Sequence, residues 1–102
     1  MRRLVIGAAA IFASSCAFVP QANHRLDDMK RAHAAALAVV EVPLLAPSEW
    51  TRASQAVDAA VQAHGTLQDP AMVDHLAYVA LQRIEIARET ARRVAAEPAL
   101  QR

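Results

Sequence analysis

A run of seven apolar residues, spaced alternately by four and three positions, constrains the fold of this chain more than any other feature. The residues are Val73, Ala77, Ala80, Ile84, Ala87, Ala91 and Val94. Because this spacing follows the 3.5-residue repeat of packed helices, it predicts one long helix with a coiled-coil-like contact line. Four of the seven residues are alanine, so a facing backbone can approach closely while each contact buries little apolar area. We call these residues the alanine seam and expect a second helix against it.

Start and stop signals predict three helices, over residues 23–42, 47–64 and 70–97. Asn23 and Asp69 are the expected N-caps, and a proline follows the first helix and the third. The apolar stripe of the first helix is Leu26, Met29, Ala32, Ala36, Val39 and Val40. The stripe of the second is Trp50, Ala53, Val57, Ala60, Val61 and His64. A short connection makes the last two helices antiparallel neighbours, so the predicted fold class is all-α, an antiparallel helical hairpin or a small three-helix bundle.

A second apolar line, formed by Met72, Val79 and Ile86, repeats every seven positions beside the alanine seam and needs a cover. One interpretation is that the first helix packs on it. The other is an interface with a second copy of the chain or with another envelope protein, because a disulfide-free domain of this size has a small core. Tyr78 points away from the seam and is a fourth candidate interaction residue. Trp50 leads its stripe and is expected in the core.

The first sixteen residues have the pattern of an export signal. Arg2 and Arg3 precede an apolar run over residues 4–12, and small residues precede Cys16, the single cysteine of the chain. The apolar run is too short to span a bilayer as a permanent helix. We therefore expect a signal peptide over residues 1–15, cleaved after Ser15, and a flexible tether over residues 16–23.

The three small residues at positions 13–15, directly before Cys16, resemble the lipobox of bacterial lipoproteins. The resemblance implies that the Cys16 thiol is diacylated before cleavage and that the new amino group is acylated afterwards. Several acyl chains attach a protein stably to a membrane, whereas one chain does so only marginally. Ala13 departs from the leucine, valine or isoleucine that the family prefers. The alternative is ordinary cleavage, with Phe18 as the first residue of the mature protein.

A further resemblance covers most of residues 26–97. Its residues are Ala46, Pro47, Ser48, Glu49, Trp50, Ala53, Asp69, Pro70, Ala71, Asp74, His75, Leu76, Ala77, Tyr78, Val79, Ala80, Gln82, Arg83, Ile86, Ala87, Arg88 and Glu89. They are similar to the alanine-rich helical module called domain of unknown function 4398. In that family the module typically follows a lipoprotein signal in Gram-negative envelope proteins and often precedes a peptidoglycan-binding domain of the outer-membrane protein A type. No such domain follows residue 97 here, so peptidoglycan binding is not implied, and the family has no established catalytic residues.

The polar residues show no pattern typical of a catalytic or metal site. None of the four histidines has a second histidine at the i, i+4 spacing of a helical metal clamp. The acids of the third helix lie among arginines, and Glu89 with Arg93 is expected to form an ion pair on a solvated face. Loss of the signal peptide lowers the formal net charge from +1 to about −1, which is too small a field to attract nucleic acid. We expect no catalytic residue, metal, cofactor or small-molecule substrate.

Together these patterns predict a non-enzymatic lipoprotein of the cell envelope. The helical domain over residues 24–97 would be a membrane-anchored spacer or protein-interaction module, and residues 98–102 a short tail. Ala17 after Cys16 lacks the aspartate that retains many lipoproteins in the inner membrane, so the resemblance implies the outer membrane, with the domain facing the periplasm. The alternative is a soluble periplasmic helical binding module or holdase, released by ordinary cleavage.

Overall fold

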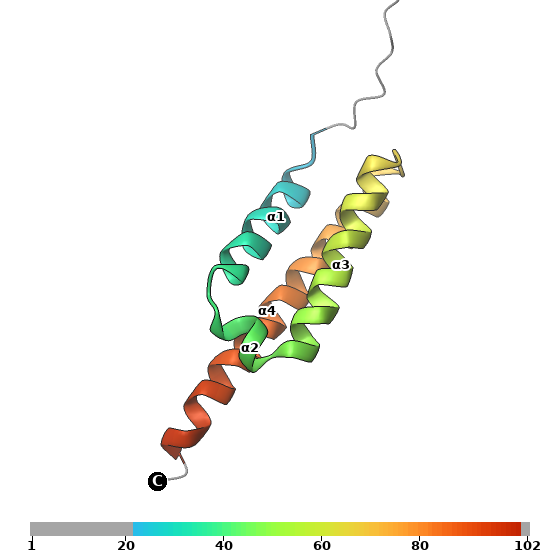
Figure 1. Ribbon diagram of the computed structural model, residues 1–102. Coiled ribbons are helices and arrows are strands. Elements are labelled where there is room, and N and C mark those ends of the chain that lie inside the picture. The colour runs from blue at the N-terminus through green and yellow to red at the C-terminus, as the bar shows by residue number, and fades with distance from the viewer. Residues whose placement is uncertain (1–21, 101–102) are drawn as a thin grey trace, which may run out of the picture.

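The computed structural model of the chain describes the backbone of residues 22–100 and the side chains of residues 22–97. This part consists of four helices and contains no strand: α1 (His24–Leu37), α2 (Glu41–Leu45), α3 (Pro47–Gly65) and α4 (Pro70–Leu100). Figure 1 shows α3 and α4 as an antiparallel hairpin, with α1 alongside it and α2 beside the C-terminal half of α4. The predicted all-α class is confirmed, and the structure has the three-helix bundle with a short additional helix.

The alanine seam lies in the core, as predicted, with its residues up to Ile84 packed among α1 and α3 and with Ala87 and Ala91 packed against the α2 segment. Its buried residues are Val73, Ala77, Ala80, Ile84, Ala87 and Ala91. The seventh residue, Val94, is half-buried, because α4 continues past α2 as a single helix (Figure 1). The predicted start of α4 is also confirmed, since Asp69 Oδ1 accepts a hydrogen bond from the Ala71 N–H at 3.0 Å. Pro70 fits the first helical position because it needs no amide partner there.

The helix α3 presents Ala53, Val57, Ala60 and Ala63 to the core. The prediction was wrong for Val61, which is 40% exposed. Val61 lies one residue, or about 100°, around the helix from Ala60, and it therefore faces sideways rather than toward α4.

The helix α1 begins as predicted and packs against the hairpin. The Asn23 side chain accepts a hydrogen bond from the Leu26 N–H at 2.9 Å, which satisfies one of the free amides at the helix start. Leu26, Met29 and Ala36 are almost completely buried in the same core cluster as the first four residues of the alanine seam. Leu26 and Met29 are among the largest fully buried side chains, so they supply most of the apolar volume that holds α1 in place.

The prediction for the C-terminal end of this first helix was wrong. The helix α1 ends at Leu37, and residues 38–40 form a turn that leads into α2. Val39 and Val40, which were expected in the buried stripe, are exposed. Pro43 does not end a helix but lies within the first turn of α2, where a missing N–H removes no intrahelical hydrogen bond.

Packing of α2 explains the break. In an unbroken helix Val42 would lie six residues, or about 240°, around from Ala36, and both could not face α4. After the turn, Val42 and Ala46 pack against Ala87 and Ala91 in a second core cluster. Burial of these residues therefore outweighs continuation of the helix.

The far end of α4 also differs from the prediction, because the helix runs to Leu100 instead of ending ahead of Pro98. A proline removes only one main-chain donor, and the helical backbone continues past it. At about 1.5 Å per residue, the 31 residues of α4 span about 46 Å. Within residues 22–100 no helix combines the length and the apolar character needed to cross a membrane.

Candidate functional site

The predicted lipidation residue Cys16 and the predicted cleavage residue Ser15 lie outside the residues that the structure describes. The described chain begins at Ala22, directly before the N-cap of α1. The membrane attachment of this protein therefore stays a prediction from the sequence. The described residues bear on the interaction surfaces of the helical domain.

One face of the hairpin carries an open groove between α3 and α4, which we call the hairpin groove. None of its lining residues belongs to α1 or α2. Its lining residues are Arg52, Gln55, Ala56, Ala59, Gln62, Ala63, Thr66, Gln68, Met72, Leu76, Val79 and Arg83. The groove is thus an apolar strip with glutamine and arginine side chains along its borders.

The structure separates the two interpretations of the line formed by Met72, Val79 and Ile86. The first helix does not pack on this line, since Met72 and Ile86 are each 49% exposed. Instead, α1 approaches the opposite flank of α4, where Arg25 forms an ion pair with Asp74 at 3.3 Å. Asp74 lies about 160° around the helix from Met72, so α1 cannot reach both flanks. Met72 and Val79 lie in the hairpin groove, and the interface interpretation stays a prediction.

Tyr78 does not belong to the same surface as the other three predicted interaction residues. It lies on the flank of α4 that faces α1, with the Arg25 guanidinium 5.6 Å from the centre of its ring. The ring is 46% exposed. Tyr78 therefore makes a cation–π contact within the chain that fastens the start of α1, and this contact occupies one side of the ring.

Two arginines at one end of the hairpin groove have no ion-pair partner among the described residues. Arg52 of α3 and Arg83 of α4 line the same part of the groove, and both are exposed. No carboxylate lines the groove. This end of the groove therefore has an uncompensated positive charge beside an apolar strip.

A second apolar surface lies where α1 turns into α2, and we call it the basal patch. It consists of Leu37, Val39, Val40 and Leu44, which are between 47% and 69% exposed. Beside it a small hollow is lined by Val42 and by the α4 residues Arg88, Ala91, Arg92 and Ala95, together with Val39 and Glu41. Contiguous exposed apolar side chains often mark an interaction surface.

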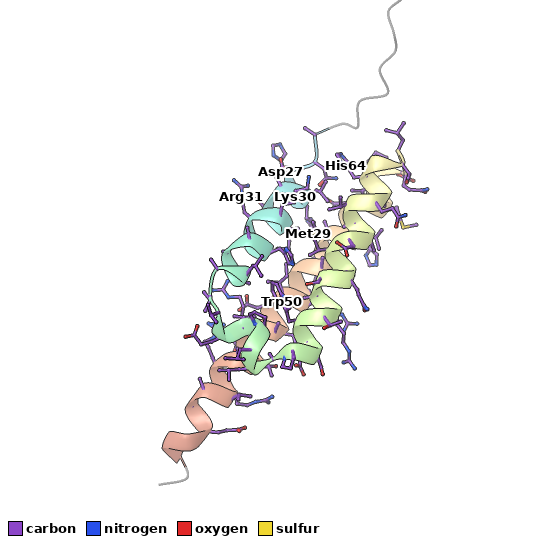
Figure 2. The ribbon with its side chains drawn as sticks, in the orientation of Figure 1. Asp27, Met29, Lys30, Arg31, Trp50 and His64 are labelled. Atoms are coloured by element: carbon purple, nitrogen blue, oxygen red, sulfur yellow. The ribbon has the colours of Figure 1, made fainter. Side chains whose placement is uncertain are left out.

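Sequence reasoning missed the contact between His33 of α1 and Trp50 of α3. The two rings are parallel, with centroids 4.8 Å apart, and His33 Nε2 lies 3.3 Å from Ser54 Oγ. Figure 2 shows Trp50 and Met29 in the space between α1 and α3. The sequence spacing could have predicted that His33 faces the core, because His33 continues the three–four pattern of Leu26, Met29 and Ala36. Trp50 is half-buried against both core clusters, as its predicted core role requires.

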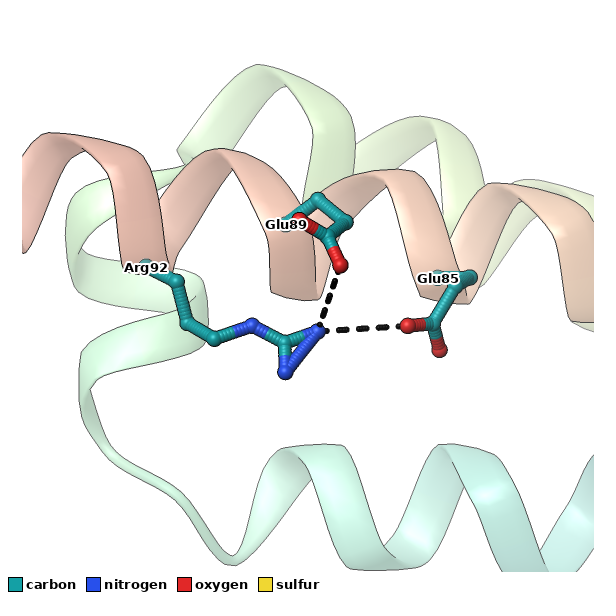
Figure 3. A network of polar contacts seen from close by, with 3 residues as sticks. All are labelled: Glu85, Glu89 and Arg92. Carbon is teal, nitrogen blue, oxygen red and sulfur yellow. Dashed lines mark hydrogen bonds and ion pairs between the residues drawn. The ribbon is translucent and has the colours of Figure 1, made fainter.

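The exposed face of α4 carries a small charge network. Figure 3 shows Arg92 between Glu85 and Glu89, with its Nη2 3.2 Å and 3.0 Å from the two carboxylates. The predicted partner of Glu89 was Arg93, and that prediction was wrong. All three side chains are more than half exposed, so solvent screens the pairs and each contributes little to stability.

Among the residues whose side chains are described, no polar or charged residue is buried, and every buried residue is apolar. The same residues contain no cluster of three or more potential metal ligands. Polar and charged side chains therefore lie at or near the surface of this part of the chain.

Comparison with known proteins identifies the family of this chain. A family model described as a domain of unknown function (DUF4398) matches residues 24–102. No curated protein and no solved structure matches the chain. The matched range includes all four helices and both surfaces described above. The chain therefore belongs to the family of domain of unknown function 4398.

Proposed function

We propose that this protein is a non-enzymatic lipoprotein of the bacterial cell envelope, in which the helical bundle serves as a membrane-anchored spacer and protein-interaction module. The observation that carries the proposal is the placement of the two ends of the bundle. The chain enters beside the α3–α4 turn, whereas the C-terminal part of α4 lies at the opposite end and projects beyond α2 (Figure 1). Attachment at one end and a projecting helix at the other suit a spacer.

The distances are consistent with this arrangement. From Cys16 to Ala22 the tether covers six residue steps and reaches at most about 20 Å. The α3–α4 turn would then lie close to the membrane, with the far end of α4 about 46 Å further away. The basal patch, including Val40 and Leu44, would be held well away from the lipid headgroups. That position makes it available to other proteins of the envelope.

The described side chains support binding rather than chemistry. The core is entirely apolar, and the acids at Glu85 and Glu89 are engaged by Arg92 on a solvated face. The hairpin groove is an apolar strip with arginines at one end, and arginines also line the hollow beside the basal patch. Arginine and methionine are enriched in protein-binding surfaces, whose buried centres are more apolar than the rest of the surface.

The intact mass of the mature protein, isolated from membranes of a Gram-negative host, tests the anchor. The native chain should begin at Cys16 and carry the added mass of its acyl chains. The Cys16→Ser variant is the matched control and should lack both the cleavage and the added mass. Ala13→Leu restores the residue that the lipobox family prefers, so it should increase the processed fraction without changing the product.

An unmodified soluble product that begins at Phe18 would contradict the anchor. The alternative would then be favoured, in which the bundle is a soluble periplasmic binding module or holdase. The exposed basal patch would suit that function as well, because a holdase needs apolar surface that is open to solvent.

A further inference from the structure

The hairpin groove is a surface of the α3–α4 hairpin that the rest of the described chain leaves uncovered. The helix α1 packs on the other face, where Leu26 and Met29 enter the core. Met72 stays 49% exposed, and Leu76 and Val79 are only partly buried. A long apolar strip at heptad spacing on an antiparallel helix pair is typical of a face that packs against more helices.

The arginines at one end of the groove and the acid just beyond its other end indicate what covers it. Arg52 and Arg83 line one end, and two like charges on neighbouring helices repel each other unless a carboxylate comes between them. The other end is lined by Thr66 and Gln68. The next residue, Asp69, is exposed and is the single acid of the turn between α3 and α4.

We propose that the hairpin groove binds the same groove of a second copy of this chain, with the two hairpins antiparallel about a twofold axis. The axis would pass close to Leu76, so that residues whose numbers add up to about 151 face each other on the two α4 helices. Met72 of each copy then packs on Val79 of the other. Arg83 lies seven residues after Leu76, and Asp69 lies seven residues before it. Arg83 of each copy therefore approaches the turn that ends in Asp69 of the other copy.

This register brings opposite charges together and also covers the apolar strip. Arg52 lies at the same end of the groove as Arg83, so both arginines of one copy approach the Asp69 end of the other. Because the axis is twofold, the same contact forms twice. A parallel arrangement would instead place the four arginines of the two copies together, and such a juxtaposition of like charges is unfavourable.

The area of the groove indicates how strongly two copies are expected to bind each other. From Arg52 to Thr66 the groove is about 21 Å long, and two neighbouring helices present a face about 20 Å wide. Each copy would bury about 400 Å², which is below the range of stable complexes and typical of weak, reversible ones. We expect a weak dimer, with a dissociation constant above the micromolar range in solution. The inference does not depend on the anchor, because the groove belongs to the helical bundle alone.

Disulfide cross-linking of variants with one added cysteine tests the register. In the purified full chain, Leu76→Cys should cross-link to itself under mild oxidation, because its two copies are offset by only about 1.5 Å along the helix. Met72→Cys alone should not cross-link, since its copies lie about 10.5 Å apart along the axis, but a mixture with Val79→Cys should. The exposed residue Lys30 on α1 provides the matched control, Lys30→Cys. The parent chain reports any reaction of Cys16.

Sedimentation equilibrium over a range of concentrations around the expected dissociation constant tests the charge contacts. Arg83→Glu should weaken the dimer at least about tenfold, because the loss occurs twice. Asp69→Lys combined with Arg83→Glu should restore it, provided that circular dichroism shows α4 still folded after loss of the Asp69 cap. Arg93→Glu, which changes the same charge on α4 outside the groove, should have no effect. A monomer at all concentrations would overturn the proposal and leave the groove to a different protein, and self-linking of Met72→Cys with itself would overturn the antiparallel register.

Discussion

Replacement of Leu26 by alanine tests whether α1 is held to the hairpin by a few large side chains. Leu26 is 1% exposed and lies in the core cluster with Met29 and the alanine seam. Leu37 at the other end of α1 is 55% exposed. The two leucines belong to the same helix and lose the same atoms on replacement, so Leu37→Ala is a matched control.

The expected magnitudes follow from the burial. A buried leucine replaced by alanine costs about 3–5 kcal/mol, but Leu26 lies in the first turn of α1, where relaxation of the helix end fills part of the cavity. We therefore expect a loss of about 2–4 kcal/mol. A domain of this size has about 4–12 kcal/mol of stability in total, so the effect is a large fraction of it. Leu37→Ala should change the stability by less than about 0.5 kcal/mol.

Urea denaturation followed by circular dichroism at 222 nm measures both effects. If α1 stays attached in Leu26→Ala, the midpoint falls while the slope of the free energy against urea is unchanged. If α1 separates from the hairpin, the slope falls too, because the folded state then already exposes the surfaces of α1, α3 and α4. Equal stabilities of the Leu26→Ala and Leu37→Ala variants would refute the packing of α1 described above.

Two further predictions concern single side chains. Leu67, in the turn between α3 and α4, has a positive φ of 59° that favours glycine, so Leu67→Gly should raise the stability by about 0.5 kcal/mol in the same urea assay, and a loss would contradict the strain. His33→Ala removes the ring stacked on Trp50, the single tryptophan of the chain, and should shift its fluorescence to longer wavelength as water reaches the indole. An unchanged spectrum would show that the stacking does not shield Trp50, and Lys30→Ala on the same helix is the control.

The strongest sequence pattern predicted the hairpin almost residue by residue. Six of the seven residues of the alanine seam are buried, and the capping roles of Asn23 and Asp69 are both present. These features are local or strictly periodic, and spacing along one helix is sufficient to predict them. The antiparallel arrangement followed from the short connection that includes Gly65.

The errors occurred where contacts between distant segments decide the structure. The break after Leu37 depends on burial of Val42 against Ala87 and Ala91, which are far apart from it in the sequence. The flank of α4 that receives α1 is the one on which Leu26 and Met29 become buried, and Arg25 pairs with Asp74 beside them. The periodicity within one helix does not indicate which flank of that helix a distant segment packs against. For the same reason the line of Met72, Val79 and Ile86 could be identified from the sequence, but whether α1 covers it could not.

The proposed membrane anchor affects the proposed dimer, because the anchor changes the local concentration of the chains. A dimer interface of about 400 Å² per copy is too weak to be populated at the low concentration of a dilute soluble protein. Lipid attachment at Cys16 would confine all copies to one surface, with their hairpin grooves at similar heights above it, and such confinement raises the effective concentration toward the millimolar range. In the antiparallel register, however, the two α4 helices extend in opposite directions from the axis near Leu76, so two copies that both stand upright with the α3–α4 turn at the membrane cannot form the contact. The upright spacer therefore predicts weaker cross-links of Leu76→Cys in membranes than in detergent solution, and stronger cross-links there would contradict it.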